Sequence, residues 1–272
     1  MTSRQHPIST PAPQSAKEPL IASLSQRSAA KETAFFTAHV RPGMSLLDCG
    51  CGPGSITVDL AALVAPGRAT GIDVDPERIE LATALAKARG VQNVTFQVGD
   101  SHMLAFPDAS FDSVLLHAVL YHLDDPKKAL GEVRRVLKPG GFVGVRDVDA
   151  SGDIWFPRSI LLDKGWSLCN QVANHRGSNL SFGRGQRALL REMGFPRTQA
   201  SASFDCYSAP QTTADFGAFW SDYLKSNAEI IVEQRWAKIN ELSEICSALV
   251  SWGEDRNAFY ARARCETVGW KD

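Results

Sequence analysis

The sequence of 272 residues lacks the features that direct a chain to nucleic acid or into a bilayer. Its 29 Lys and Arg residues are matched by 30 Asp and Glu residues, so the formal net charge of -1 gives no electrostatic reason to bind nucleic acid. No apolar run approaches the roughly 20 residues that a membrane-spanning helix needs. We therefore expect neither a nucleic-acid partner nor membrane insertion.

Cysteine is also scarce. The six cysteines are scattered, with no Cys-x-x-Cys pair and no Cys/His ladder. This pattern predicts reduced thiols, a cytoplasmic location and no structural zinc site. Cys49 and Cys51 could form a ligand pair, but their glycine-rich surroundings favour an interpretation as small loop residues. Residues 1–18 are polar and rich in proline, which predicts a flexible N-terminal tail.

From residue 45 onward, strand and helix patterns alternate. The predicted strands are 45–49, 68–74, 93–98, 111–116 and 142–148, and the predicted helices between them are 56–64, 75–90 and 125–137. Asp75 with Pro76, and Asp125 with Pro126, are typical helix starts. Alternation at this spacing predicts an α/β fold, with a parallel sheet covered by helices on both faces.

The last third of the chain follows a different pattern. It predicts helices at 154–173 and 186–193, a strand at 198–207, helix formers over 210–252 and a last strand at 259–270. We expect these two strands to close the sheet, with a helical insertion between them. The predicted organisation is a tail over 1–18, a main domain made of 19–208 and 254–272, and a helical insertion or substrate lid over 209–253.

The first chemical motif is the segment Asp48-Cys49-Gly50-Cys51-Gly52-Pro53-Gly54, between a predicted strand and a predicted helix. Glycines at alternate positions let the backbone turn sharply and let a ligand lie against bare main chain. A nucleotide-type ligand would lie across the carboxyl ends of the strands, where the strand order reverses.

Two acidic motifs follow the next two strands. Asp73 ends the second strand, where a carboxylate can accept both hydroxyls of a ribose, while Asp75 fills the role of helix cap. Asp100 follows the third strand and can accept a hydrogen bond from an exocyclic amine such as that of adenine. Because parallel strands end at one edge of a sheet, we expect the three motifs to converge.

Together these motifs resemble those of the class I S-adenosylmethionine-dependent methyltransferases. The stretches that carry the resemblance are LLDCGCGPGSIT, GIDVD, VGDSHMLAFPDASFDSV and LKPGG, in the family's order across about residues 27–149. They look most like the small-molecule branch of the ubiquinone- and menaquinone-biosynthesis type. The C-terminal part also resembles bacterial and fungal members that modify secondary metabolites. The resemblance implies a Rossmann-like fold: a seven-stranded, mostly parallel sheet with an antiparallel last strand.

The resemblance further implies S-adenosyl-L-methionine as cofactor and S-adenosyl-L-homocysteine as product. The glycine segment would line the methionine part of the cofactor, Asp48 would reach its amine, and Asp73 would bind the ribose. The residues so implicated are Asp48, Gly50, Cys51, Gly52, Gly54, Asp73, Val74 on the adenine face, Asp100 and Ser101 at the adenine edge, and His117 near the sulfonium.

His117 and Asp147 are the candidate catalytic residues, because each lies at the end of a predicted strand on the ligand edge. The imidazole of His117 titrates near neutral pH and could act as a general base; the alternative is a half-buried histidine that orients the loop. Asp147, like Asp149, could bind a polar substrate group or act as base, and Arg146 could pair with either acid. A metal site is disfavoured, because the fourth strand ends in His117 rather than an acid.

Aromatic residues after the same edge are the candidate acceptor-binding residues. Tyr121 could donate a hydrogen bond to substrate, and Trp155 and Phe156 could wall an apolar cup. Further candidates for this cup, for which ordinary helix packing is the alternative, are Trp166, Trp220, Tyr223 and Trp236.

The sequence thus predicts in-line methyl transfer to a small-molecule acceptor, such as a quinone-like aromatic or a secondary metabolite. The N/D-P-P-Y/F motif of amino-directed nucleic-acid methyltransferases does not follow the fourth strand, where His117-Ala118-Val119-Leu120 stands. The alternatives are a cofactor-binding cyclase or isomerase, a non-catalytic methyltransferase-like binding protein, and an NAD-linked reductase. The last is disfavoured because G-x-G-x-G differs from the G-x-G-x-x-G spacing that seats a pyrophosphate.

Overall fold

The computed structural model describes residues 27–272, so the tail predicted over 1–18 lies outside the described residues. The described chain forms two compact units. The N-terminal unit comprises residues 27–147, 185–201 and 266–272, and the helical unit comprises residues 148–184 and 202–265. The helical unit contains the predicted insertion, 209–253, together with further segments; its role as a lid stays a prediction.

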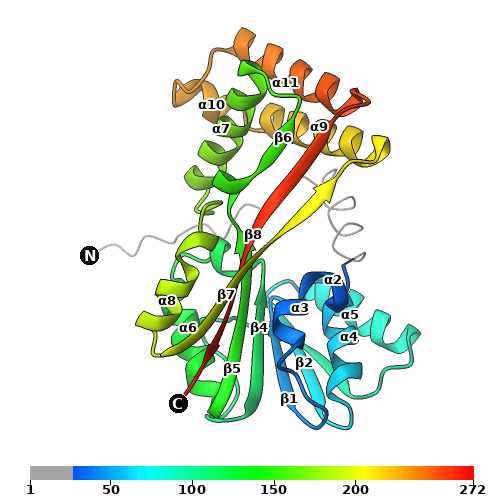
Figure 1. Ribbon diagram of the computed structural model, residues 1–272, viewed down its shortest axis with the longest axis vertical. Helices are drawn as coiled ribbons and strands as arrows, with labels where there is room; N and C mark the ends of the chain where they lie inside the picture. Colours follow the sequence, from blue (N-terminus) through cyan, green and yellow to red (C-terminus); the bar gives the residue numbers. More distant parts are fainter. Residues whose placement is uncertain (1–26) are drawn as a thin grey trace. The chain divides into compact units, whose positions relative to one another are not determined.

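The N-terminal unit is built on a twisted parallel sheet (Figure 1). Its strands lie in the order β3 (Val94–Val98), β2 (Arg68–Asp73), β1 (Ser45–Cys49), β4 (Phe111–His117) and β5 (Leu137–Val148). Each neighbouring pair among these five strands is parallel. The order reverses at β1, which has β2 on one side and β4 on the other, so the carboxyl ends of these strands form the crevice expected for ligands in such sheets.

The helices of this unit are α2 (Ala29–Glu32), α3 (Ala34–Thr37), α4 (Ser55–Val64), α5 (Pro76–Ala88), α6 (Pro126–Val136) and α8 (Gln186–Glu192). Helices α4, α5, α6 and α8 begin within one residue of their predicted starts. The carboxylate of Asp75 accepts the Glu77 N–H at 3.0 Å, and that of Asp125 accepts the Lys128 N–H at 2.9 Å. Each cap is followed by proline at the first helical position, where its missing N–H is harmless.

The predicted closing strands are present as β7 (Arg197–Tyr207) and β8 (Phe259–Trp270). In the sheet, β8 follows β5, and β7 pairs with β8. The predicted Rossmann-like class, a mostly parallel sheet with antiparallel C-terminal strands, is confirmed. The short strand β6 (Ile154–Phe156) adds an eighth strand to the predicted seven.

The LKPGG stretch differs from the prediction. We expected it to end a helix, with a strand beginning at Phe142, but β5 begins at Leu137. Leu137 pairs with Phe111 and Phe142 pairs with Ser113, so the four residues between them bulge out of the ladder. Gly140 takes a positive φ of 76° in this bulge, which is why a proline-glycine segment is accommodated inside a strand.

The helical unit contains a second difference. Ile154–Phe156, predicted as the start of a helix, is the strand β6, and it pairs antiparallel with β8. Pro157 follows and has no N–H for the ladder, so the strand ends there. The helix α7 (Ile160–His175) begins only after Ser159, whose hydroxyl accepts the Leu162 N–H at 3.2 Å.

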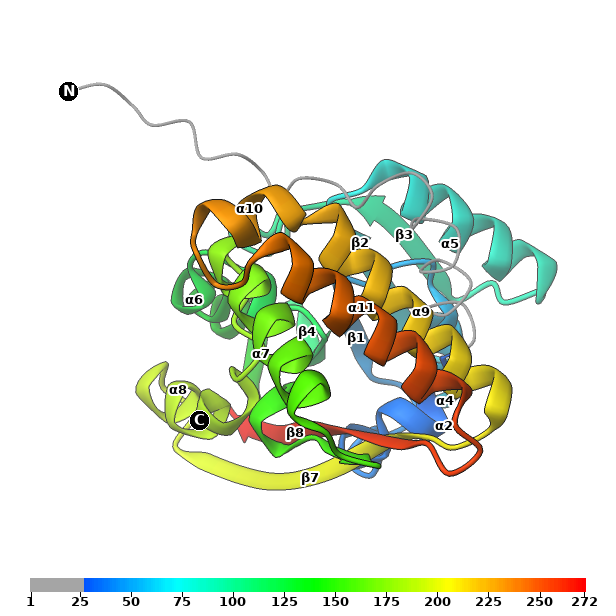
Figure 2. The ribbon, with the colours of Figure 1, turned by 90° about the horizontal axis from the view of Figure 1, so that it is seen from above.

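Four helices make up most of the helical unit: α7, α9 (Pro210–Ser226), α10 (Ala228–Glu233) and α11 (Ile239–Glu254). Figure 2 shows α9 and α11 side by side. Their backbones approach closely at two glycines: a Cβ on Gly217 would lie 2.4 Å from the Leu249 carbonyl oxygen, and one on Gly253 would lie 2.7 Å from that of Thr213. None of the helices within residues 27–272 has the length and apolarity to span a membrane.

Candidate cofactor and acceptor sites

The glycine loop joins β1 to α4 in a left-handed backbone path. Gly50, Gly52 and Gly54 have φ values of 75°, 54° and 82°. A Cβ on Gly50 would lie 2.5 Å from the Val119 side chain, whereas a Cβ on Gly52 would meet nothing within 4 Å. Gly50 is therefore required for packing, and Gly52 leaves one stretch of main chain open to a ligand.

The loop is anchored on the neighbouring strand β2. The N–H groups of Gly50 and Cys51 donate to the Ile72 carbonyl at 2.7 and 2.9 Å. The N–H of Gly52 donates to the Asp73 carboxylate at 2.9 Å. Burial raises the pKa of the Cys49 and Cys51 thiols far above the usual range, so both are protonated packing residues of the loop.

Asp48 is buried beneath the loop. Its Oδ2 accepts the Thr57 hydroxyl at 2.6 Å. Burial raises the pKa of this carboxyl to about 7; the Thr57 hydrogen bond opposes that rise, and the negative charge of Asp73 adds to it. The two carboxyls thus interact, and a positive charge placed near them would favour the ionised form of Asp48.

Asp73 lies at the end of β2 and is buried. Its Oδ2 accepts the Gly52 N–H, and its Oδ1 accepts the Asp75 N–H at 3.0 Å. The Arg78 guanidinium is 3.7 Å from Oδ2. Each carboxylate oxygen can accept a second hydrogen bond, so these contacts orient Asp73 and leave it acceptor capacity for ribose hydroxyls.

The third motif lies beside the second. Asp73 is in register with Val98 at the end of β3, and Asp100 follows two residues later. Burial opposes ionisation of Asp100, but hydrogen bonds from the backbone N–H and the ring of His102 outweigh it and hold its pKa below the usual value. Ser101 is buried, while the neighbouring Val74 is 65% exposed. The exposed valine gives this edge an apolar surface that a planar ring could cover.

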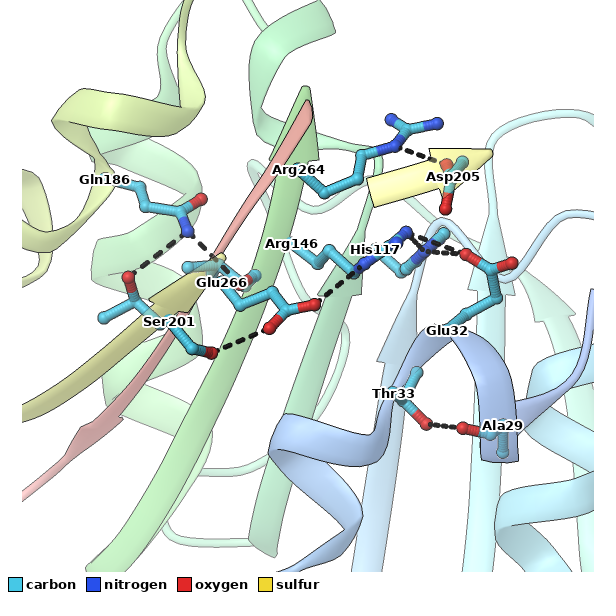
Figure 3. A network of polar contacts seen from close by, with 12 residues as sticks. Ala29, Glu32, Thr33, His117, Arg146, Gln186, Ser201, Asp205, Arg264 and Glu266 are labelled. Atoms are coloured by element: carbon cyan, nitrogen blue, oxygen red, sulfur yellow. Dashed lines mark hydrogen bonds and ion pairs between the residues drawn. The ribbon is translucent and has the colours of Figure 1, made fainter. Parts of the chain in front are cut away.

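His117 ends β4 within a buried network of charges (Figure 3). Its Nε2 lies 3.0 Å from Nη1 of Arg146 and 3.4 Å from Oε2 of Glu32. Arg146 also pairs with Glu32 at 2.7 Å and with Glu266 at 3.2 Å. Because guanidinium only donates, the hydrogen bond from Arg146 assigns a neutral imidazole that accepts at Nε2.

This network bears on two expectations. The acidic partners of Arg146 include Glu32 and Glu266, neither of which was expected from the sequence. Nε2 of His117 lies 3.0 Å from a guanidinium, which opposes protonation of the ring, and 3.4 Å from the Glu32 carboxylate, which favours it. The general-base role and the alternative, in which His117 orients the loop, both stay predictions.

The remaining candidate acids have structural partners. Asp147 is fully buried, and its Oδ1 accepts the Val119 N–H at 3.1 Å, which ties β5 to the loop after β4. In the helical unit, Asp149 accepts two hydrogen bonds from Arg184, from Nε and Nη2, each at 2.7 Å. This bidentate pair was not expected from the sequence. Among residues 27–272, no three His, Cys, Asp or Glu side chains are grouped to hold a metal ion.

Tyr121, Trp155 and Phe156, the aromatic candidates for acceptor binding, do not share one cavity wall. The Tyr121 ring lies beside that of His122 in a 3₁₀ turn, with ring centroids 3.7 Å apart and the planes tilted by 36°. Trp155 lines a cavity of about 260 Å³ that lies within the helical unit. Phe156 is 58% exposed and is not among the lining residues, so the expected pairing of Trp155 and Phe156 in one cup does not occur.

The cavity wall combines four aromatic side chains with polar ones. Trp155, Trp166, Trp220 and Tyr260 line it, with Asp153 and Arg262 among the polar residues. Trp166 stacks on Tyr260 at a centroid distance of 5.4 Å and meets Trp220 edge-on at 5.7 Å. Tyr260 and Arg262 were missed by the sequence analysis. The available signal was polar and charged residues at alternate positions of a predicted strand, which need partners on one face.

The glycine loop and the acidic strand ends of a Rossmann-like sheet define the class of the protein: an S-adenosylmethionine-dependent class I methyltransferase. The chain belongs to the family described as "Methyltransferase domain", whose model matches residues 41–181. This membership confirms the predicted enzyme class and removes the NAD-linked alternative.

Individual proteins support the assignment. The chain is 31% identical over 269 residues to the "Probable methyltransferase ltbC" of Aspergillus luteorubrus, covering 90% of this chain and 92% of that protein. It is 37% identical over 105 residues to a demethylmenaquinone methyltransferase of Symbiobacterium thermophilum, covering 38% and 42%. The solved structure of the YcgJ protein of Bacillus subtilis shares the fold, with a TM-score of 0.59, 23% identity, and coverage of 86% of this chain and 94% of that one.

The residues present fit the family's cofactor. Gly52 offers open main chain, Asp48 and Asp73 form a buried acidic pair suited to a cationic ligand, and Val74 is an exposed apolar surface beside them. Open main chain, carboxylates and an apolar surface are the kinds of group that suit the methionine, ribose and adenine parts of S-adenosylmethionine, respectively.

Proposed function

We propose that this methyltransferase acts on a small aromatic acceptor, such as a quinone-like compound or a related secondary metabolite. The observation that carries the proposal is the aromatic cavity of about 260 Å³ in the helical unit. An apolar cavity of about 150 Å³ holds benzene, so this one has room for one or two substituted rings. The demethylmenaquinone methyltransferase among the relatives also acts, by its name, on a quinone-type compound.

S-adenosylmethionine supplies an electrophilic methyl group on a cationic sulfur. We assign the residues that hold it as the resemblance implies: Gly50, Cys51, Gly52 and Gly54 along the methionine part, Asp48 toward its amine, Asp73 and Val74 at the adenosine, and Asp100 and Ser101 at the adenine edge. The hydrogen bond between the Gly52 N–H and Asp73 supports this assignment, since it couples the loop to the ribose-binding acid.

The protein's main contribution to catalysis is alignment. Holding two reactants in contact geometry can lower a barrier by roughly 7–11 kcal/mol. We assign positioning roles to His117, which is held by Arg146, and to Asp147, which holds the Val119 N–H. An acidic acceptor such as a phenol then needs little help from a general base. The proposal includes the cytoplasmic location expected from the scattered cysteines.

The test is turnover. The protein is incubated with S-adenosylmethionine labelled on the methyl group, and with a panel of phenols, hydroquinones and aromatic ketones beside an extract of its own organism. Mass spectrometry should detect a labelled product and an equal amount of S-adenosylhomocysteine. A product of unchanged mass would instead show a cyclase or isomerase, and cofactor binding without any product would show a binding protein.

A further inference from the structure

The cavity of the helical unit carries more information than its size, and the acceptor chemistry inferred from it rests on the proposed function. Its wall mixes aromatic rings with hydrogen-bonding groups, and the two kinds of polar group are not balanced. A ligand that fills the cavity must complete whatever the protein leaves unmatched, because buried polar groups are nearly always hydrogen-bonded.

The unmatched groups are donors. The indole Nε1–H groups of Trp166 and Trp220 are buried and have no hydrogen-bond partner within residues 27–272. Both residues line the cavity and are only 8% and 7% exposed. An indole N–H can donate but not accept, so each can be satisfied only by an acceptor atom.

The two carboxylates of the wall, in contrast, already receive protein donors. Asp153 accepts the Tyr260 hydroxyl and, at 2.8 Å, the Ala263 N–H. Asp163 accepts the Trp155 indole at 3.2 Å and the Arg158 guanidinium at 3.0 Å. A ligand that brings only donors would compete with bonds that are already made.

One ring face of the wall is already occupied by a cation. The Arg262 guanidinium lies over the Trp220 ring, 5.4 Å from its centroid. It occupies the cation-binding face of that ring and would repel a second cation there. The Trp220 face is therefore unsuited to an ammonium ligand, and the carboxylates of Asp153 and Asp163 already accept protein donors.

We infer that the cavity selects a planar aromatic acceptor bearing a carbonyl-type oxygen, and that the indoles of Trp166 and Trp220 donate to this oxygen function. Rings of this class stack on the aromatic wall, and their carbonyl oxygens supply the two lone pairs that the indoles lack. The two tryptophans thus determine specificity for the acceptor.

The experiment compares three phenols of similar size: 4-hydroxyacetophenone, which has the carbonyl; 4-ethylphenol, which lacks it; and tyramine, which carries an ammonium. Calorimetry is done on the full chain saturated with S-adenosylhomocysteine. The ketone should bind about five- to tenfold more tightly than 4-ethylphenol, as expected for one or two net hydrogen bonds. Tyramine should bind no better than 4-ethylphenol.

Variants then separate the N–H from the ring. Trp166→Phe and Trp220→Phe each remove a donor along with some ring area. Lost area weakens the ketone and 4-ethylphenol alike, whereas the lost donor weakens only the ketone, so the ratio of the two dissociation constants should fall toward one in the double variant. Trp236→Phe, a half-buried tryptophan of the same unit outside the cavity wall, is the matched control and should keep the wild-type ratio.

Three results would overturn the inference. The wild-type protein could bind the ketone and 4-ethylphenol with equal dissociation constants, the double variant could keep the wild-type ratio of these constants, or tyramine could bind most tightly. The outcomes are distinguishable from failure of the proposed function. Selective ketone binding with no methyl transfer to any compound leaves the cavity chemistry standing and removes the acceptor role. Methyl transfer to a compound without a carbonyl, together with equal dissociation constants for the ketone and 4-ethylphenol, keeps the proposed function and removes the carbonyl specificity.

Discussion

Two buried polar clusters, one in each unit, are completed in different ways. In the N-terminal unit, Arg146 is only 2% exposed and is surrounded by Glu32, Glu266 and His117. In the helical unit, the indole donors of Trp166 and Trp220 are buried with no partner among the residues described. Polar groups that are matched inside the protein fix a conformation, whereas unmatched groups beside a cavity can bind a ligand. The contrast is between the Arg146 network and the wall of the proposed acceptor cavity.

The largest expected effect comes from disrupting the buried network around Arg146. Arg146→Met keeps the length of the side chain and removes its charge, which leaves Glu32 and Glu266 buried without their cation. Removal of one partner from a buried ion pair costs about 3–5 kcal/mol. Urea unfolding at neutral pH should show this loss of unfolding free energy.

The matched control lies in the helical unit. Arg158 is exposed, pairs with Asp163 at 3.0 Å and lies over the Trp155 ring. Arg158→Met should reduce the unfolding free energy by no more than about 1 kcal/mol, the scale of an exposed ion pair. Equal losses in the two variants would contradict the contrast drawn between the two clusters.

Asp48→Asn is expected to have the next largest effect, and it increases stability. The pKa of Asp48 is raised from 3.8 to about 7 by burial, so the folded state holds its proton more tightly than the unfolded state does. That difference destabilises the native protein progressively as pH rises from about 4 to 7. At one pKa unit per 1.36 kcal/mol, the penalty reaches up to about 4 kcal/mol above pH 7.

The asparagine cannot ionise and escapes this penalty, while its oxygen can still accept the Thr57 hydroxyl. Thermal melts should therefore show similar stability for the two proteins at pH 4, and a higher melting temperature for the variant at pH 8. Affinity for S-adenosylmethionine should fall in the same variant, because the charge that favours its cationic groups is gone. A stability difference that does not grow with pH would show that Asp48 ionises freely in the native state.

These effects bear on how far the sequence alone could go. The cofactor motifs were predictable because each is a run of consecutive residues at a strand end, and parallel strands bring such ends to one edge. Asp73 and Val98 are in register, as that logic requires. The partners of Arg146 were not predictable, since Glu32 and Glu266 come from opposite ends of the described chain.

The wall of the proposed acceptor cavity was predicted only in part. Trp155, Trp166 and Trp220 were candidates from the sequence, whereas Tyr260 and Arg262 were not. The tryptophans lie on β6, α7 and α9 and Tyr260 lies on β8, so no local spacing marks them as one wall. Local patterns also misplaced Ile154–Phe156, because the choice between strand and helix there depends on the edge that β8 offers for pairing. Sequence patterns indicate what each segment can form, and long-range partners decide which of those forms is adopted.

A smaller effect concerns the cofactor site itself. Asp73→Asn retains one acceptor oxygen and loses the negative charge, so hydrogen bonds to the ribose become neutral. Affinity for S-adenosylhomocysteine should fall about 10- to 100-fold, which corresponds to roughly 1.4–2.8 kcal/mol. Asp125→Ala, which removes a helix cap from α6, is a control for general destabilisation and should leave calorimetric affinity unchanged. Unchanged affinity in Asp73→Asn would remove this residue from the cofactor site.

The smallest prediction compares two serines, one from each unit. Ser201 donates to Oε2 of Glu266 at 2.7 Å, so Ser201→Ala removes a charge-assisted bond from the edge of the matched network. Because Glu266 keeps its ion pair with Arg146, the loss of unfolding free energy should be only about 1 kcal/mol.

Ser221 is fully buried on α9, and its hydroxyl has no partner in the part of the chain that the structure describes. Ser221→Ala should therefore be neutral or stabilising by about 0.5 kcal/mol, since alanine also has the higher helix propensity. Urea midpoints that shift in opposite directions for the two variants would support the contrast between a matched and an unmatched hydroxyl; destabilisation of both by the same amount would mean that the Ser221 hydroxyl has a partner, as the Ser201 hydroxyl does.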